Sequence, residues 1–254
     1  VELSAGVTLD NTSGGSLANL GGNAQEWNGN FTFTGSNSYD FGAGAVALKA
    51  DASLTVTTKT LTIGGVIDDG LDSFTLTKLG AGVLVLNGAN SFGGAGQTVT
   101  IAGGRLTVSS DAGLGDAANS LTIAASGATV DTGFGVTGDI DTSRAVYLNA
   151  AINSIDVLGG KTLKLNADFG VSSPTNTLVK NGSGRLTLAV ANSLAWTGGI
   201  TIANGIVRLG ADDAVGASSK TISLSGSPAV FGNALELSGG ITVANPLTLQ
   251  STGD

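Results

Sequence analysis

Short runs along most of the chain alternate between aliphatic and hydroxyl-bearing side chains. In the first half of the chain these runs occupy residues 53–56, 74–77, 83–86, 98–101, 105–108 and 120–123. A period of two places Leu, Val and Ile on one face and Thr and Ser on the other, as in a half-buried β-strand. Gly, Asn and Asp bound the runs and favour turns, and no segment holds apolar residues at helical spacing. The pattern therefore predicts an all-β protein.

The runs recur at two distances. Residues 75–86 return as residues 177–188, an offset of 102 residues. A shorter period of 22 or 23 residues is marked in the first long unit by Leu54, Leu76, Val99 and Leu121. A period of 20–50 residues is typical of stacked units that cannot bury a core alone. We therefore predict a parallel β-helix (β-solenoid) with coils of about 22 residues, and we place the four marker side chains in one interior column.

An immunoglobulin-like sandwich is the alternative fold, because the offset of 102 residues is close to the length of such a domain. The 22-residue period argues against it, since the strands of a sandwich differ in role. Tyr39 and Tyr147 lie outside the aligned repeat segments and do not supply a tyrosine corner, and three prolines are few for the edges of a sandwich. Antiparallel pairing of the runs around Leu76 and Leu84 would contradict the solenoid.

An ordered motif overlaps the alternating runs of the first long unit. Residues 78–92 read K-L-G-A-G-V-L-V-L-N-G-A-N-S-F, and T-I-A-G-G-R-L follows at residues 100–106. This series resembles the passenger-associated transport repeat of autotransporter passengers. Residues 180–207 resemble the same repeat with losses, since Val190 and Asn204 stand where the first copy has glycines.

A second motif supports this resemblance. Residues 27–33 and 196–202 share the pattern W-x-G-x-hydrophobic-T-hydrophobic. The resemblance covers residues 54–249 well and residues 1–53 loosely. It implies a right-handed parallel β-helix that is secreted or exposed at the outer cell surface. In the family this shaft carries adhesion, self-association or a grafted enzyme domain.

Composition narrows the classes of function. The chain has no Cys, no His and no Met, and 41% of its residues are hydrophobic, so it can bury a core. No apolar run approaches the roughly 20 residues of a transmembrane helix. The net charge is −8 and the 11 basic residues are scattered, which argues against nucleic acid and anionic membrane surfaces as partners. Without His and Cys, Ser–His–Asp and Cys–His catalysis and zinc–thiolate sites are excluded.

Clustered carboxylates are the first candidates for chemistry. The clusters are Asp68, Asp69 and Asp72; Asp139 and Asp141; and Asp212 and Asp213. Parallel β-helix enzymes that act on polysaccharides use such pairs, and calcium is a second possibility. However, Asp also favours turns, the clusters fall between predicted strands, and no His, Cys or basic cluster accompanies them. We interpret them as solvated turns and predict no catalytic, cofactor-binding or metal-binding residues and no cofactor.

Aromatic and amide side chains offer further candidates. Trp27 and Trp196 precede a Gly and a strand, which favours packing at a corner of the coil over a carbohydrate-stacking platform. Asn90 and Asn192 are equivalent in the repeat and are expected in turns, with an Asn ladder inside the coil as the alternative. Rows of Thr and Ser on the strand faces predict a flat, weakly charged surface that can pair with a copy of itself.

We expect residues 1–254 to form a single β-solenoid that is part of a longer repetitive protein at the surface of a bacterium. The expected function is a non-enzymatic structural or adhesive segment whose partners are copies of itself, neighbouring repeats or surface carbohydrate. One alternative is a subunit that polymerises into a fibre or surface layer, because residues 1–3 and 246–249 read as uncapped terminal strands. The other alternative is a polysaccharide-active enzyme on the same fold.

Overall fold

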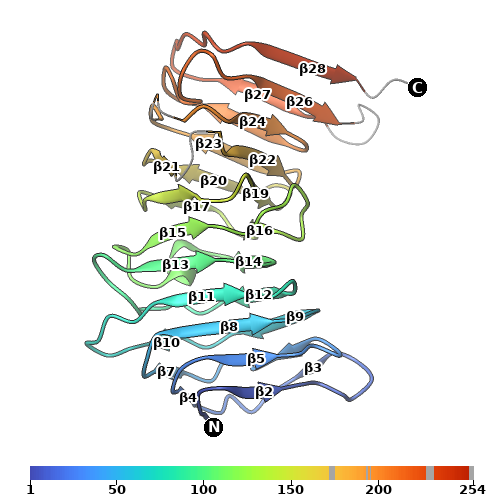
Figure 1. Cartoon of the computed structure of the whole chain (residues 1–254), viewed down its shortest axis with the longest axis vertical. Coiled ribbons are helices and arrows are strands. Elements are labelled where there is room, and N and C mark those ends of the chain that lie inside the picture. The colour runs from blue at the N-terminus through green and yellow to red at the C-terminus, as the bar shows by residue number, and fades with distance from the viewer. Residues whose placement is uncertain (172–174, 193, 195, 227–231, 252–254) are drawn as a thin grey trace. The chain divides into compact units, whose positions relative to one another are not determined.

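The computed structural model describes residues 1–171, 175–192, 194, 196–226 and 232–251. Two compact units make up the chain, unit 1 (Val1–Ala125) and unit 2 (Ser126–Asp254). Within each unit short strands lie one above another and are joined by loops (Figure 1). None of the described residues forms a helix long and apolar enough to cross a membrane.

Unit 1 consists of three stacks of hydrogen-bonded strands. Stack A contains β1 (Glu2–Leu3), β4 (Gln25–Trp27), β7 (Val46–Leu48) and β10 (Ile67–Asp68). Stack B contains β2 (Val7–Leu9), β5 (Phe31–Phe33), β8 (Ala52–Val56), β11 (Leu76–Leu79), β13 (Thr98–Ile101) and β15 (Ser120–Ile123). Stack C contains β3 (Leu17–Ala18), β6 (Tyr39–Asp40), β9 (Thr60–Ile63), β12 (Val83–Leu86) and β14 (Arg105–Val108). A 3₁₀ helix, η1 (Asp111–Leu114), lies between β14 and β15.

Unit 2 repeats this construction. Stack D contains β17 (Ile140–Thr142), β20 (Thr162–Leu165), β23 (Arg185–Leu188), β25 (Ile206–Leu209) and β27 (Ala234–Leu237). Stack E contains β18 (Val146–Leu148) and β21 (Phe169–Val171). Stack F contains β16 (Gly133–Val136), β19 (Ile152–Val157), β22 (Thr177–Asn181), β24 (Gly199–Ile202), β26 (Ile222–Gly226) and β28 (Leu247–Ser251).

The predicted β-solenoid is confirmed. Strand neighbours within each unit pair in parallel, and in unit 1 the residues that face each other are 21 to 24 positions apart in sequence. The runs around Leu76 and Leu84 do not form a hairpin, because β11 pairs with β8 and β13, while β12 pairs with β9 and β14. An immunoglobulin-like sandwich is therefore rejected.

One register prediction needs a correction. A column here means the residues that face one another along a stack. Leu76, Val99 and Leu121 form the predicted interior column of stack B, but Ala52 occupies the place predicted for Leu54. Leu54 lies two residues further along β8 and faces Lys78. Both Ala52 and Leu54 are buried, so the hydrophobic pattern fits either register equally well.

The core of each unit is the inside of the coil. Leu54, Leu76, Leu84 and Leu106 in unit 1 have no exposed surface, and neither has Leu178 in unit 2. The intervening Thr and Ser residues of β5, β8, β11, β13 and β15 point outward and are half-buried. The alternation in the sequence therefore becomes an aliphatic interior with a hydroxyl-rich exterior.

Candidate functional site

Lys78 is a charged residue inside the coil. It belongs to the column Leu54, Lys78, Ile101, Ile123 and has no exposed surface. Its Nζ donates hydrogen bonds to the carbonyl oxygens of Leu79 at 2.7 Å, Gly80 at 2.9 Å and Gly103 at 3.1 Å. An ammonium group has three donors, so all three are satisfied. Since Gly103 lies one coil further on, Lys78 ties two successive coils together.

Glycines bring these carbonyl oxygens within reach of the ammonium group. Gly80 has φ +79°, and a Cβ atom there would lie 2.3 Å from the Val56 carbonyl oxygen. Gly104, next to Gly103, has φ +57°, and a Cβ atom there would lie 2.3 Å from the carbonyl oxygen of Gly82. Only glycine accepts both the left-handed conformation and the close approach of the neighbouring turn. Gly80 and Gly104 therefore allow the turns of successive coils to stack around Lys78.

Lys180 repeats this arrangement in unit 2. It faces Ile155 and Ile202 in a column of stack F and is fully buried. Its Nζ donates to the carbonyl oxygens of Asn181 at 2.6 Å, Gly182 at 2.7 Å and Asn204 at 3.2 Å. The Asn204 carbonyl takes the place of the Gly103 carbonyl, so the substitution of this glycine in the second copy preserves the acceptor.

Burial changes the acidity of both ammonium groups. It lowers the pKa of Lys78 from 10.5 to about 8. It also lowers the pKa of Lys180 to about 8, and there the negative charge of Asp156 acts in the opposite direction. With these pKa values both side chains are mostly charged at pH 7. From the sequence alone, both lysines were identified only as positions of the repeat. Their signal was an inward position in the alternating pattern.

Asn90 and Asn192 connect coils at a second corner. Asn90 lies between β12 and β13, accepts the Ile67 N–H at 2.8 Å and donates to the Gly113 carbonyl oxygen at 2.8 Å. Asn192 accepts the Phe169 N–H at 2.6 Å and donates to the Ala214 carbonyl oxygen. The predicted turn placement is confirmed, and each amide bridges the coil before it and the coil after it.

The two tryptophans pack inside the coils. Trp27 and Trp196 have no exposed surface, and each makes an edge-on contact with a phenylalanine, Phe31 at 5.0 Å and Phe169 at 5.5 Å between ring centres. Trp196 Nε1 donates to the Asn176 carbonyl oxygen at 2.6 Å. Packing at a corner is confirmed, and neither ring is available for stacking on a sugar.

The first acidic cluster orders loops. Asp69 is buried and accepts the N–H groups of Phe74 at 2.9 Å and Gly93 at 2.8 Å. Asp68 accepts the Ser91 hydroxyl, and this hydrogen bond is the main cause that lowers the pKa of the Asp68 carboxyl. A carboxyl with a lowered pKa stays ionised and is not prepared to donate a proton near neutral pH.

The other acidic clusters also bind neighbouring strands or loops. Asp139 accepts the Thr162 N–H at 2.9 Å, and Asp141 forms an ion pair with Lys164 at 3.0 Å. Asp212 accepts the N–H of Thr242 at 2.6 Å. Among the described residues, no group of three His, Cys, Asp or Glu side chains could hold a metal ion. That the chain has no catalytic, cofactor-binding or metal-binding residues stays a prediction.

An uncharged surface covers stack B of unit 1. We call it the hydroxyl face, and it consists of Thr8, Thr32, Ser53, Thr55, Thr77, Thr98, Thr100, Ser120 and Thr122. Ser53, Thr77, Thr100 and Thr122 face one another in register and form one continuous row. Every outward position of β5, β8, β11, β13 and β15 is Thr or Ser except Leu79, and none of these positions carries a charge.

Stack D of unit 2 has the opposite character. One outward row contains Asp141, Lys164, Thr187, Arg208 and Glu236. Lys164 pairs with Asp141 at 3.0 Å, and Arg185 reaches Glu236 at 3.1 Å. These exposed pairs contribute little stability, but they give this face a mixed charge that the hydroxyl face lacks.

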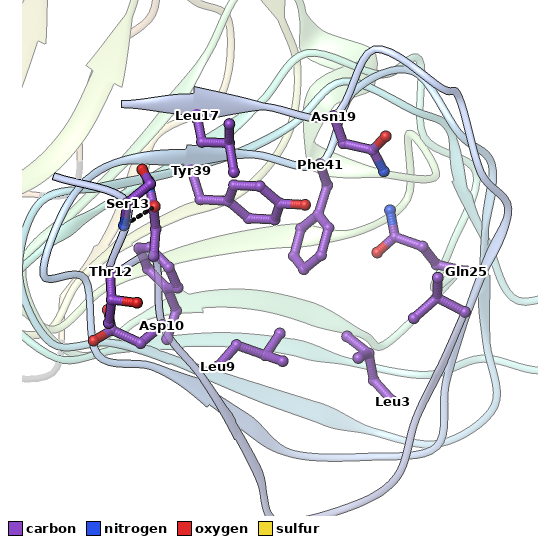
Figure 2. Close-up of a pocket in the computed structure, with 13 residues that line it drawn as sticks. Leu3, Leu9, Asp10, Thr12, Ser13, Leu17, Asn19, Gln25, Tyr39 and Phe41 are labelled. Carbon is purple, nitrogen blue, oxygen red and sulfur yellow. Dashed lines mark hydrogen bonds between the residues drawn. The ribbon is translucent and has the colours of Figure 1, made fainter. Parts of the chain in front are cut away.

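Unit 1 also contains a cavity of about 490 Å³ in its first coils. Leu9, Leu17, Tyr39 and Phe41 point into the same space in Figure 2, with Gln25 at one side. The wall is mainly apolar and carries one carboxylate, Asp10, whose pKa is lowered mainly by the hydroxyl of Ser36. The cavity has the composition of an opened coil interior and offers no pair of groups for acid–base chemistry.

Comparison with known proteins agrees with the repeat geometry. Residues 76–108 and 178–209 match the family described as passenger-associated-transport-repeat, and these segments contain Lys78 and Lys180. The chain is 34% identical over 134 residues to the "Adhesin BmaC autotransporter" of Brucella suis biovar 1 (strain 1330). That match covers 53% of this chain and 4% of the length of the relative. No solved structure gives a significant match. The predicted resemblance to an autotransporter passenger domain with passenger-associated transport repeats is confirmed.

Proposed function

We propose that this chain is a non-enzymatic structural and adhesive segment of a bacterial surface protein, with the hydroxyl face as its contact surface. The observation that carries the proposal is a solenoid built around two passenger-associated transport repeats. The name of the matching Brucella protein, an autotransporter adhesin, supports a place at the outer cell surface.

The chemistry of the hydroxyl face supports adhesion to an uncharged partner. Its rows of Thr and Ser offer donors and acceptors at the regular spacing of parallel strands, about 4.8 Å. A partner that lacks charge loses little solvation when it meets such a surface, and many small contacts add up over its area. We propose surface carbohydrate or a second copy of the chain as the partner, and we expect no nucleic acid and no membrane insertion.

Two paired lysine substitutions test this proposal. Thr77→Lys with Thr100→Lys places two charges side by side on the hydroxyl face, because these residues face each other in register. Thr201→Lys with Ser223→Lys is the matched control on stack F, since this pair is also in register and half-buried. Binding of the purified chain to fixed epithelial cells is measured by flow cytometry, before and after periodate oxidation of the cell-surface sugars.

We expect saturable binding that falls severalfold in the Thr77/Thr100 variant and changes little in the Thr201/Ser223 control. Loss of binding after periodate treatment would identify carbohydrate as the partner. Equal loss in both variants, or no binding by the unmodified chain, would contradict an adhesive hydroxyl face. Release of reducing ends from a polysaccharide by the purified chain would contradict the non-enzymatic assignment.

A subunit that associates through its coil ends is the second candidate. Leu237, Leu247 and Leu249 in β27 and β28 are exposed by 55%, 54% and 72%. Apolar surface of this kind associates with neighbouring coils of the same protein or with another copy. Analytical ultracentrifugation of the chain checks this: concentration-dependent assembly is expected, and a strictly monomeric chain at tens of micromolar would contradict it.

A further inference from the structure

The register of stack B is weakly specified by hydrophobicity alone. The inward positions of β8 are Ala52, Leu54 and Val56, and those of β13 are Val99 and Ile101. A slip of one residue would turn the apolar face outward, but a slip of two residues keeps all five of these apolar residues inward. Strands of this composition therefore have competing registers two residues apart, which hydrophobic burial barely distinguishes.

Lys78 distinguishes these registers by a hydrogen bond that no aliphatic side chain can make. Its hydrogen bonds to Leu79 and Gly80 stay within its own turn, whereas its hydrogen bond to the Gly103 carbonyl oxygen crosses to the next coil. A slip of two residues between β11 and β13 would shift this carbonyl by about 6–7 Å along the strand. The buried ammonium group would then lose its acceptor on the next coil, and an unpaired donor on a buried charge is costly.

A role in stability alone does not explain the lysine. Taking an ammonium group out of water carries a large desolvation penalty, and an aliphatic side chain of similar volume is often neutral or stabilising at such a site. The best-attested use of a buried polar group is to select one register from several. The same triad of carbonyl acceptors surrounds Lys180, where the Asn204 carbonyl again comes from the next coil.

We propose that Lys78 and Lys180 are register-setting residues of the solenoid. Through its ammonium group, each lysine aligns its own coil with the next coil. The glycines of the repeat allow close stacking of the turns, and the lysine selects which turns are stacked. This role is independent of the adhesive function proposed above, and it would hold for a passenger with any surface activity.

The absence of cysteine from the chain allows a direct test by disulfide trapping. Thr77 faces Thr100 in the observed register, and neighbouring strands place such Cα atoms about 4.8 Å apart, within reach of a disulfide. Thr77 and Thr98 are diagonal and about 8 Å apart, too far to be bridged unless β13 slips by two residues. Thr77→Cys with Thr100→Cys therefore reports the observed register, and Thr77→Cys with Thr98→Cys reports the slipped one.

Each reporter pair is placed in three backgrounds: Lys78, Lys78→Met and, as the control, Lys49→Met, which removes an exposed lysine of the same unit. The full chain is refolded under reducing conditions and then oxidised, and the bridged fraction is measured by mass spectrometry. A third pair, Ser53→Cys with Thr77→Cys, reports the pairing of β11 with β8, which the Lys78 ammonium group does not contact.

With Lys78 or in the control, we expect the Thr77–Thr100 bridge and almost no Thr77–Thr98 bridge. In Lys78→Met the Thr77–Thr98 bridge should rise about tenfold or more, while the Ser53–Thr77 bridge and cooperative thermal unfolding persist. A Lys78→Met chain that forms only the Thr77–Thr100 bridge would overturn the proposal. A Lys78→Met chain that does not fold would also overturn it, because the ammonium group would then serve stability and not register.

Discussion

Lys78 and Lys180 make equivalent hydrogen bonds to backbone carbonyl oxygens, but the side chains around them differ. Lys78 is followed by Leu79, and burial alone accounts for its lowered pKa. Lys180 is followed by Asn181, whose side chain donates to the Ser154 hydroxyl at 2.8 Å, and Asp156 raises the pKa of Lys180 against the effect of burial. The backbone acceptors are nevertheless equivalent in both copies. The repeat therefore preserves the cage of carbonyl oxygens, while the side chains around it vary.

Charge reversal should have the largest effect on either site. Lys78→Glu or Lys180→Glu would place a carboxylate against three carbonyl oxygens with no donor, at a cost of about 3–5 kcal/mol in the free energy of unfolding. The loss should be greater for Lys180→Glu, since Asp156 adds a second negative charge nearby. Urea unfolding of both variants measures the difference. Equal losses would show that Asp156 does not act on this site.

Substitution of the turn glycines should rank next. Gly80→Ala and Gly182→Ala each bring a Cβ atom to 2.3 Å from a backbone carbonyl oxygen, so we expect a loss of about 2–3 kcal/mol in each copy. Gly6→Ala is the matched control, because it has φ +83° but no atom within 4 Å of the new Cβ. It should lose only about 1 kcal/mol. Losses as large at Gly6 would attribute the effect to backbone conformation and not to turn stacking.

Removal of charge from the first acidic cluster should have a smaller effect. Asp68→Asn with Asp69→Asn keeps the side-chain volume but replaces carboxylate acceptors of several hydrogen bonds, so a loss of about 1–2 kcal/mol is expected without loss of the fold. Cell binding should persist. Polysaccharide cleavage that this double substitution abolishes would show instead that the cluster is catalytic.

The pH dependence of stability should report on both lysines together. Below pH 8 both lysines are charged in the folded and the unfolded chain. Above about pH 8 the folded chain loses these protons, whereas the unfolded chain keeps them until near the ordinary lysine pKa of 10.5. Unfolding then takes up protons, so the free energy of unfolding should rise between about pH 8 and 10.5 relative to a Lys78→Met, Lys180→Met chain. Parallel curves for the two chains would contradict the lowered pKa values.

A single substitution separates the two sites within this pH range. Asp156→Asn removes the negative charge that raises the pKa of Lys180, so this pKa should fall below that of Lys78. Titration of the two side chains by NMR would detect the change. The pKa of Lys78 should stay the same and serves as the internal control.

Much of the fold follows from the alternating pattern. The expected runs 83–86, 98–101, 105–108 and 120–123 coincide with β12, β13, β14 and β15. The register of β8 was wrong by two residues, because Ala52 and Leu54 are both buried and apolar, and only the contacts of the folded coil distinguish them. Periodicity identifies which face of a strand is buried, but it does not fix the alignment between neighbouring coils.

The candidate site was harder to predict for a related reason. Lysines are ordinarily expected at the surface, and a buried lysine needs acceptors that lie far apart in sequence. The acceptor of Lys78 on the next coil is the carbonyl oxygen of Gly103, 25 residues away in sequence. Only the register of the strands shows that this oxygen lies close to the Lys78 ammonium group. The tryptophans and asparagines were predicted correctly in position, because their signal is local: they flank turns next to a strand.

Two ammonium groups are held by backbone carbonyl oxygens inside the coil. NMR of the chain with ¹⁵N-labelled lysine at neutral pH tests this directly, because protons of a buried, hydrogen-bonded ammonium group exchange with water far more slowly than those of an exposed one. We predict slowly exchanging ammonium signals, of which Lys78→Met removes one and Lys180→Met another. Spectra in which neither substitution removes a protected signal would contradict the account.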